Sequence, residues 1–349
     1  MTLRIGSLCT GYGGLDMAVQ AVLDAEVAWV ADPDPGAAAI LAHHHPDTSN
    51  HGDITTTDWA AVEPVDILTA GFPCQPISAA GHGRGIHDDR WLFDDITQAI
   101  GRMVTRPRML LLENVPRLLT LGGGHAMACV VHGLARLGYV GRYRVLSAAD
   151  IGAPHLRKRI FILAVADTQG VAQREPADET LAVTEGGHAR PQPCRGGVHA
   201  DAHPVGTRPQ GACRTPEWVT TAAERGTVAV ADPDRHGREI VVRVKPEVGA
   251  WQDVDRRSSV RWGGYGPAVE RWESITGRTA PDPAETAPQG GRRIAARFME
   301  WMQGLPDGHV TNVPGLSYPQ QIIALGNGVV PQQGEAALRM LLVDAGRTT

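Results

Sequence analysis

The sequence predicts an α/β protein with two domains, and three observations support this fold class. The chain of 349 residues is long enough for one sizeable α/β domain and a second, smaller unit. The stretch "LRIGSLCTGYGGLDMAVQAVL" leads from an apolar strand, Leu3 to Leu8, through a glycine-rich turn into an amphipathic helix. From about residue 166 to 291 the chain becomes polar, rich in Gly and Pro and without clear periodicity, which marks a different unit.

The composition is that of an ordinary soluble globular protein. Hydrophobic residues make up 42% of the chain and charged residues 20%. No stretch of about 18 uninterrupted apolar residues occurs, so we expect no membrane span. The N-terminus begins directly with a strand pattern and has no signal-peptide layout, so we expect a cytoplasmic protein.

Cysteine and histidine usage predicts no metal site. The chain has an odd number of cysteines and no CxxC pair, which favours a reducing compartment over a disulfide framework or a zinc site. The cysteines are residues 9, 74, 129, 194 and 213. Three adjacent histidines, His43 to His45, point in different directions on a helix and have no partner at a ligand spacing. We therefore expect a solvated helix end there.

The charge balance neither favours nor excludes a nucleic-acid partner. The net charge of −5 and pI of about 6.3 lack the basic footprint of most nucleic-acid binders. Only Lys158 and Lys245 are lysines, and arginine makes bidentate contacts with phosphate and guanine that lysine does not copy. Codon bias in a GC-rich gene explains most of this arginine excess.

The N-terminal segment reads as a nucleotide-type βαβ unit. Gly11, Gly13 and Gly14 allow the backbone to bend sharply and to approach a ligand closely, at the N-terminus of the helix that follows. Asp32 follows the second strand pattern, where an acid commonly binds ribose hydroxyls, and Asp53 in "HGDITTTDW" is placed to accept from an adenine amine. Each acid alone is more often a cap or turn residue. The ordered series favours the binding site.

A cysteine between two prolines follows the next strand. Ile67 to Thr69 read as the end of a buried strand, and Pro73 and Pro76 make the loop around Cys74 stiff. A free cysteine is often just a small buried hydrophobe. A packing residue needs no proline on each side, however, and loops at strand ends are where ligands and chemistry collect in α/β proteins.

Two further strand ends carry charged residues. Glu113 follows the apolar strand Met109 to Leu112, where a lone carboxylate would simply cap the next helix. Arg157 and Arg159 alternate before the strand Ile160 to Val165, a pattern that usually faces solvent. Together with Cys74 they make a nucleophile, an acid and two anion binders at successive strand ends.

With these motifs the sequence resembles the DNA (cytosine-5) methyltransferase family of bacterial or phage type, which uses S-adenosylmethionine. "GFPCQPIS" resembles the nucleophile loop of that family, "ENV" its acid, "APHLRKR" its arginine element and "LGNGVVPQ" its closing Gly-Asn-x-Val element. The resemblance covers most of the chain. It implies a Rossmann-like methyltransferase domain with a mixed, mostly parallel sheet, plus a smaller target-recognition domain.

The resemblance also implies a role for individual residues. Cys74 would be the nucleophile, Glu113 would bind the base, and Arg157 and Arg159 would order the catalytic pocket. The residues implied to bind the cofactor are Cys9, Gly11, Tyr12, Gly14, Asp32, Asp53, Ile54, Pro73, Leu92, Asn327 and Val329. Those implied to contact DNA are Gln75, Ser78, which would hold a phosphate, and Arg297 of "RFMEWMQGLP".

The chain departs from the pattern of that family at three places. Ser7 and Cys9 stand where an acid and an aromatic residue are usual, Asp32 replaces the commoner glutamate, and His155 replaces a glutamine. The first two departures keep hydrogen-bond chemistry available while changing how the cofactor packs. The role of position 155 stays open.

The family's chemistry explains these residue types. Cytosine C5 is too weak a nucleophile until a thiolate adds at C6, so Cys74 must be partly ionised, which nearby arginines favour. Charge that develops toward N3 and O2 needs a donor, which Glu113 and Arg157 can supply if burial keeps Glu113 protonated. Because C6 is inaccessible inside a stacked duplex, the target nucleotide must flip out.

The resemblance implies a division of the chain and a set of partners. We expect a catalytic domain over residues 1–165, a target-recognition domain over 166–311 and a segment over 312–349 that returns to the catalytic domain. Double-stranded DNA would lie in the cleft between the two domains. We expect a monomer, with a cognate restriction endonuclease as a candidate partner. Three alternatives stay open: a tRNA cytosine-5 methyltransferase, an inactive DNA-binding relative, and a middle segment unrelated to DNA.

Overall fold

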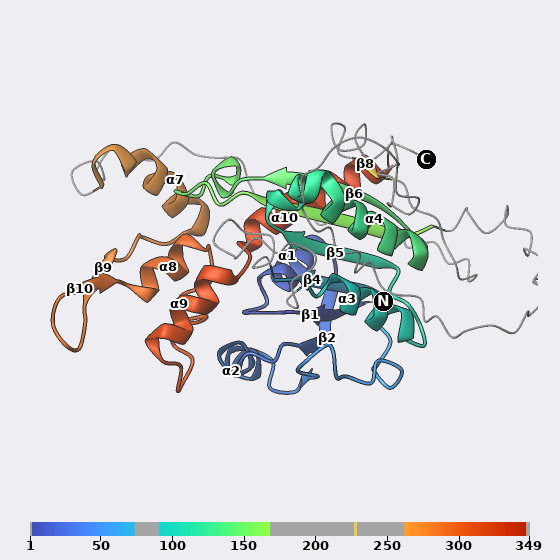
Figure 1. Cartoon of the computed structure of the whole chain (residues 1–349). Coiled ribbons are helices and arrows are strands. Elements are labelled where there is room, and N and C mark those ends of the chain that lie inside the picture. The colour runs from blue at the N-terminus through green and yellow to red at the C-terminus, as the bar shows by residue number, and fades with distance from the viewer. Residues whose placement is uncertain (1, 74–90, 168–226, 229–261, 347–349) are drawn as a thin grey trace, which may run out of the picture.

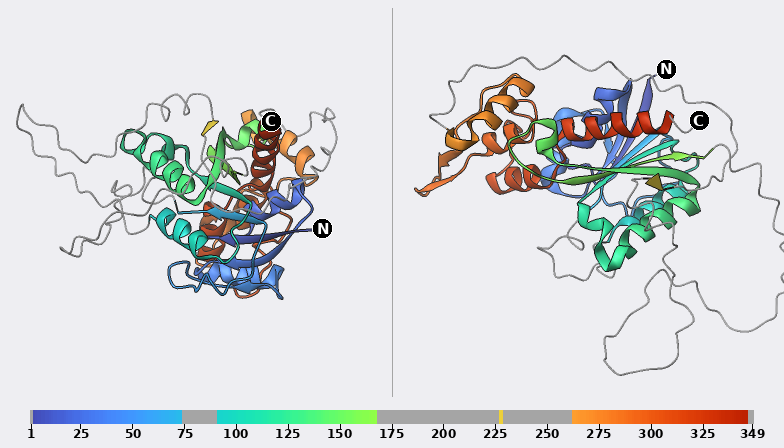
Figure 2. Two further views of the ribbon diagram at one scale, coloured as in Figure 1. Left: turned by 90° about the vertical axis from the view of Figure 1, so that its right-hand side faces the viewer. Right: turned by 90° about the horizontal axis from the view of Figure 1, so that it is seen from above.

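The computed structural model describes residues 2–73, 91–167, 227–228 and 262–346. Its centre is one mixed sheet with the strand order β3-β2-β1-β4-β5-β7-β6-β8. Helices cover both faces of this sheet, and a smaller unit that contains a two-stranded hairpin extends beyond one end of it (Figures 1 and 2). Cys74, Gln75 and Ser78 lie outside the described residues.

The elements follow one another along the chain in a largely alternating order. The strands are β1 (Leu3–Leu8), β2 (Ala25–Ala31), β3 (Ser49–Asn50), β4 (Ile67–Gly71), β5 (Met109–Asn114), β6 (Tyr139–Leu146), β7 (Arg159–Ala166), β8 (Thr227–Val228), β9 (Ala284–Thr286) and β10 (Arg292–Ile294). The α-helices are α1 (Gly14–Val22), α2 (Pro35–His44), α3 (Phe93–Arg102), α4 (His125–Leu137), α7 (Gly266–Thr276), α8 (Ala296–Met302), α9 (Tyr318–Asn327) and α10 (Pro331–Gly346). Short 3₁₀ helices are η2 (Pro116–Leu119), η3 (Leu121–Gly124), η4 (Ala148–Ile151) and η6 (Gly263–Tyr265).

The sheet is parallel on one side and antiparallel on the other. Strands β3, β2, β1, β4 and β5 pair in parallel, whereas β7 pairs antiparallel with β5 and β6, and β8 antiparallel with β6. The strand order runs away from β1 in both directions, so the crevice for a ligand lies at the carboxyl ends of β1 and β4. The predicted Rossmann-like α/β fold with a mixed, mostly parallel sheet is confirmed.

The two faces of the sheet have separate cores. On one face, α3 and α4 bury Phe93, Ile96 and Val130 against the sheet, and α3 presents its apolar residues at helical spacing. On the other face, α1 and α10 lie side by side and bury Val19 and Leu338 together with residues of β1, β5 and β7. The sheet is therefore held between two helical layers.

A smaller unit is built from α7, the β9–β10 hairpin and α8 (Figure 1). Trp272 and Trp301 are fully buried in its core, and Trp272 Nε1 donates to the Trp301 carbonyl at 2.9 Å. The same core contains Ala153, which precedes β7, and Val330, which precedes α10. This packing holds the smaller unit against the segment that leads into the arginine element.

The histidines at the end of α2 differ from expectation. His43 is exposed as predicted, but the ring of His44 stacks on that of His309, with the ring centroids 4.0 Å apart. His44 Nε2 lies 2.7 Å from the His309 carbonyl, and His309 Nε2 lies 2.9 Å from the Tyr12 carbonyl. The prediction of a solvated helix end was therefore wrong for His44. The contact partner of His44 lies 265 positions away along the chain, so no local pattern could reveal it.

Candidate active site

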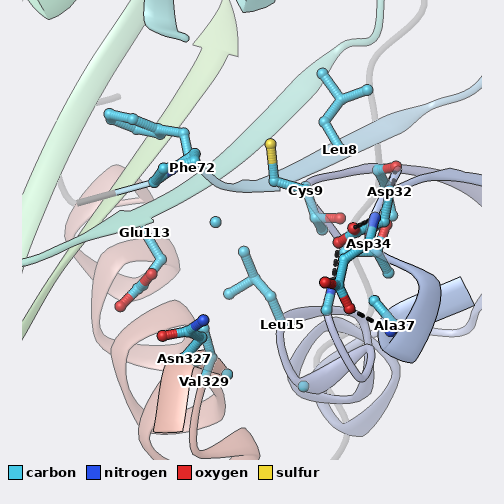
Figure 3. A pocket seen from close by; sticks show the side chains of 18 of the residues that line it. Leu8, Cys9, Leu15, Asp32, Asp34, Ala37, Phe72, Glu113, Asn327 and Val329 are labelled. Atoms are coloured by element: carbon cyan, nitrogen blue, oxygen red, sulfur yellow. Dashed lines mark hydrogen bonds between the residues drawn. The ribbon is translucent and has the colours of Figure 1, made fainter. Parts of the chain in front are cut away.

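A cavity of about 340 Å³ lies at the carboxyl ends of the parallel strands. Figure 3 shows Glu113 and Asn327 on one side of it, and Asp32 and Asp34 on the other. The predicted site residues that line this cavity are Cys9, Gly11, Gly14, Asp32, Pro73, Leu92, Glu113, Arg159, Asn327 and Val329. The fold thus brings together segments from opposite ends of the sequence.

The glycine-rich turn after β1 forms one wall. Gly11 and Gly13 have φ angles of 59° and 81°, in the left-handed region that glycine adopts without strain. A Cβ on Gly14 would lie 2.2 Å from the Val329 carbonyl oxygen, so only glycine allows this close approach. The close approach lets the Gly-Asn-x-Val segment reach the cavity from the other end of the chain.

Asp32 holds this turn in place. Its Oδ2 accepts from the Gly11 N–H at 2.8 Å, and its Oδ1 accepts from the Asp34 N–H at 2.9 Å. Burial raises the pKa of Asp32, while these two backbone donors lower it. A carboxylate oxygen can accept more than one hydrogen bond, so Asp32 keeps capacity for a ligand hydroxyl.

Cys9 contributes an unusual thiol to the same wall. Its φ of 50° makes it the one non-glycine residue with positive φ in the described part of the chain. Burial, followed by the charges of Asp32 and Asp53, raises the pKa of the Cys9 thiol to about 12. The thiol therefore stays protonated at neutral pH, which makes Cys9 a packing group and not a nucleophile.

The opposite end of the cavity carries an ion pair. Arg159 Nε lies 2.7 Å from Glu113 Oε1, and both side chains are largely buried. Burial raises the pKa of Glu113, and the charges of Arg159 and Arg157 oppose that rise. Because β7 runs antiparallel to β5, the first residue of β7 lies beside the end of β5, which is what places Arg159 next to Glu113.

Comparison with known proteins agrees with this geometry. The family model for C-5 cytosine-specific DNA methylase matches residues 3–201, more than half of the chain. The chain belongs to this family. It is 40% identical over 129 residues to the type II methyltransferase M.NgoBI of Neisseria gonorrhoeae, a match that covers 37% of this chain and 40% of that protein. It is 36% identical over 162 residues to M.NlaX of Neisseria lactamica, covering 46% of this chain and 51% of that protein.

The matches to curated relatives span about half of those proteins or less, whereas the structural matches are nearly complete. The S. pombe Dnmt2 methyltransferase superposes with a TM-score of 0.52 at 18% identity, covering 98% of this chain and 99% of that one. The Entamoeba histolytica methyltransferase EhMeth gives a TM-score of 0.56 at 12% identity, with 99% of each chain covered. At such identities the likeness shows a shared fold.

Arg157 has a different environment from Arg159. Its guanidinium donates to the carbonyls of Gly326 and Gly328 at 2.9 and 2.6 Å and does not line the cavity. Gln333 Nε2 in turn donates to the Arg157 carbonyl at 2.9 Å. Arg157 therefore fixes the Gly-Asn-x-Val segment, while Arg159 stands beside Glu113.

His155 connects the segment before β7 to the smaller unit. Its Nε2 lies 2.9 Å from the Met302 carbonyl at the end of α8. Burial, first, and then the charges of Arg157 and Arg159 lower the pKa of His155, so the ring is neutral and donates through Nε2. His155 thus makes a single polar contact to the end of α8.

Besides Arg157, four predicted site residues do not line the cavity. Tyr12 is buried beneath the turn and donates its hydroxyl proton to the Val329 carbonyl at 2.8 Å. Asp53 is exposed and accepts from the N–H and the hydroxyl of Thr55, and Ile54 is buried next to it. Arg297 is exposed on α8, with a guanidinium nitrogen 3.2 Å from Asn312 Oδ1. All four side chains lie outside the cavity.

Sequence reasoning missed several residues that line the cavity. Phe72 precedes Pro73 in the quoted loop and packs its ring against Trp91 and Phe93, so its position beside the nucleophile loop was a usable signal. Asp34 also lines the cavity, and its Oδ1 caps α2 by accepting from the Ala37 N–H at 2.9 Å. Ile323 of α9 carried no signal, because only the fold brings α9 to this cavity.

The described residues contain neither a candidate metal site nor a candidate membrane-spanning helix. Residues 2–73, 91–167, 227–228 and 262–346 contain no group of three or more His, Cys, Asp or Glu side chains arranged to hold a metal ion. Within the same ranges, no helix is both long enough and apolar enough to cross a membrane.

Proposed function

We propose that this chain is a DNA (cytosine-5) methyltransferase that transfers a methyl group from S-adenosylmethionine to C5 of a flipped-out cytosine in duplex DNA. The observation that carries the proposal is the cavity that joins the glycine turn and Asp32 to the Glu113–Arg159 pair. One end has the groups that suit a nucleoside, and the other has the groups that suit a base undergoing acid-assisted addition. Family membership supports the same reaction.

The cavity fits S-adenosylmethionine, which supplies an electrophilic methyl group on a sulfonium when bound. Its volume of about 340 Å³ lies in the range of small-ligand sites. Asp32 follows β2 at the position from which a carboxylate accepts from ribose hydroxyls. Apolar walls from Leu15, Phe72 and Leu92 suit an adenine ring, and Gly11 has open space where a Cβ would stand.

Glu113 and Arg159 are proposed to act on the target base. Burial raises the pKa of Glu113, which would favour donation of a proton toward N3, and Arg159 would donate N–H groups to the neighbouring carbonyl oxygen. Each donation stabilises the negative charge that develops on the ring when a thiolate adds at C6. Arg157 orders the cofactor segment through Gly326 and Gly328.

Cys74 is proposed as the nucleophile that adds to C6. It lies outside the described residues, but Pro73, directly before it, lines the cavity. Cys9, the thiol that also lines the cavity, is held protonated by burial and by two carboxylates. A nucleophilic thiol must reach the thiolate form, so Cys74 is the better candidate.

The rest of the chain is proposed to supply target recognition. Residues 166–311 would read the DNA sequence through arginine and amide contacts, with Gln75, Ser78 and Arg297 contacting the strand near the flipped base. Residues 312–349 would complete the catalytic domain. The curated relatives are type II methyltransferases, which favours a cognate restriction endonuclease as partner of a monomeric enzyme.

Covalent trapping tests this function. Duplex DNA that carries 5-fluorocytosine at the target site should form a stable adduct with the protein and S-adenosylmethionine, because fluorine does not leave as a proton does. Cys74→Ala should form no adduct and transfer no methyl group. Methyl transfer by the Cys74→Ala protein would end the proposed mechanism.

The nucleic-acid substrate is tested in parallel. Duplex DNA and tRNA are offered side by side with labelled S-adenosylmethionine, and bisulfite sequencing locates the product. Label in DNA at a defined sequence is expected. Label in tRNA alone would replace DNA as the substrate, and S-adenosylmethionine binding without transfer to either would favour an inactive DNA-binding relative.

A further inference from the structure

A buried carboxylate lies behind the cavity wall without taking part in the mechanism above. Asp16 is in the first turn of α1 and is only 3% exposed. Its Oδ2 accepts from the Ser7 hydroxyl at 2.8 Å, and its Oδ1 accepts from the Thr69 hydroxyl. Asp16 therefore links α1 to strands β1 and β4 beneath the glycine-rich turn.

The two hydroxyls connect Asp16 to the cavity. Ser7 and Thr69 are direct neighbours in the pairing of β1 with β4, and both line the cavity, whereas Asp16 does not. A hydroxyl has one proton to donate, and both donate it to Asp16. Neither hydroxyl proton is then available to a ligand, and the negative charge of Asp16 lies directly behind these two lining residues, where it attracts cationic groups and repels anionic ones.

No cation neutralises Asp16 within the described part of the chain. The charged side chains on elements that pack around α1 are paired elsewhere: Arg4 of β1 with Glu26 of β2, and Arg339 of α10 with Glu335. Burial raises the pKa of Asp16 to about 6, and the hydrogen bonds from Thr69 and Ser7 oppose the rise, so Asp16 is charged above neutral pH.

We propose that Asp16 is a positioning residue whose uncompensated negative charge, transmitted through Ser7 and Thr69, makes the cavity prefer the sulfonium S-adenosylmethionine over the neutral thioether S-adenosylhomocysteine. The inference rests on the proposed function, and it adds an electrostatic preference that favours release of S-adenosylhomocysteine after methyl transfer. A charge near the cavity acts only on the ligand that carries the opposite charge. A purely structural tie between α1, β1 and β4 would act on both ligands alike.

Calorimetry of both ligands, without DNA at pH 8, tests the role of Asp16. Asp16→Asn keeps the shape of the side chain and removes its charge. The ratio of the S-adenosylhomocysteine Kd to the S-adenosylmethionine Kd should fall roughly tenfold, the size expected for one charge acting through a partly screened protein interior. An equal change in both dissociation constants would overturn the inference and leave Asp16 as a structural residue.

Glu300→Gln is the matched control. Glu300 is a fully buried carboxylate that accepts from the backbone N–H groups of Gly308, Val310 and Thr311, and it does not line the cavity. The same carboxylate-to-amide change there should leave the ratio of the two dissociation constants unchanged. A fall of similar size in this variant would also contradict the inference.

A second variant covers the case in which Asp16→Asn does not fold. Ser7→Ala removes one hydrogen bond that favours charged Asp16, so the pH at which the Kd ratio changes should move upward. An unmoved midpoint would contradict the inference. Failure of the wild-type protein to bind either ligand would instead defeat the proposed function, so the two failures are distinguishable.

Discussion

Two buried carboxylates lie at the same cavity in contrasting surroundings. Glu113 lines the cavity at the end of β5, with the Arg159 guanidinium 2.7 Å away. Asp16 lies behind the wall formed by β1 and β4 and has two hydroxyls in place of a cation. Burial raises the pKa of both groups. The two carboxyl groups therefore differ in their hydrogen-bond and charge partners, not in how deeply they are buried.

The contrast indicates two uses of a buried acid. A carboxyl beside an arginine can exchange a proton with a bound base while the arginine holds the remaining charge, which suits a step of the reaction. A carboxylate that only hydroxyls stabilise keeps its charge unneutralised, which suits the selection of a cationic ligand. The second arrangement destabilises the fold, because an unpaired buried charge is costly.

The largest expected effect is at Glu113, the carboxyl proposed to act on the base. Glu113→Gln keeps the shape and the burial but cannot transfer a proton to the base. We expect methyl transfer to slow by about 10²–10⁴-fold, the usual contribution of a positioned acid, with S-adenosylmethionine affinity unchanged. Single-turnover assays measure the rate of methyl transfer, and calorimetry measures the affinity for S-adenosylmethionine. A wild-type rate in this variant would remove Glu113 from the mechanism.

The pH profile of the wild-type enzyme sharpens that test. In the proposed mechanism the protonated form of Glu113 is the reactive one, and burial raises its pKa, so the rate should be high below that pKa and fall as the pH rises through it. The falling limb should be absent in Glu113→Gln. A fall in rate with rising pH that persists in the variant would report the titration of another ionisable group.

The next effect concerns the stability of the fold at Asp16. Its pKa is about 6 when folded and near 3.8 when unfolded, so the folded state binds the proton more tightly. Stability from this group is complete below the unfolded pKa and is lost as the pH rises through 6. The loss is about 2–3 kcal/mol over that window, because a tenfold difference in proton affinity between the two states corresponds to about 1.4 kcal/mol.

Asp16→Asn should remove this pH dependence. Urea unfolding of both proteins at steps from about pH 4 to about pH 7.5 should show that the variant gains about 2–3 kcal/mol relative to wild type across the range. The variant would then be the better folded protein and the poorer discriminator between the two cofactor forms. A constant difference across the pH range would mean that Asp16 does not change its charge there.

The smallest effect separates the two acids of the nucleotide-type series. Asp32 lines the cavity, whereas Asp53 is exposed and engaged with Thr55. Asp32→Ala should weaken S-adenosylmethionine binding by about 1–3 kcal/mol, the cost of losing a buried hydrogen-bond partner. Asp53→Ala should cost less than about 0.5 kcal/mol, as for most surface changes. Calorimetry without DNA measures both, and equal losses would bring Asp53 back into the site.

Local patterns in the sequence were enough for the fold class and for much of the site. The glycine turn, the acid after β2 and the polar residues at the end of β5 are short-range signals, because backbone sterics and strand ends act over a few residues. Most of the residues predicted to bind the cofactor line the cavity together for that reason. The motifs also led to the family that the comparison confirms.

Tertiary structure decided what each charged group does. Arg157 and Arg159 look equivalent in sequence, but the antiparallel direction of β7 sets Arg159 beside Glu113, while Arg157 reaches Gly326 and Gly328. Asp16 reads as an ordinary first-turn acid until the pairing of β1 with β4 brings Ser7 and Thr69 to it. Sequence determines which elements form, because their periodicity is local. The partner of a buried charge depends on contacts between distant segments, which no local pattern records.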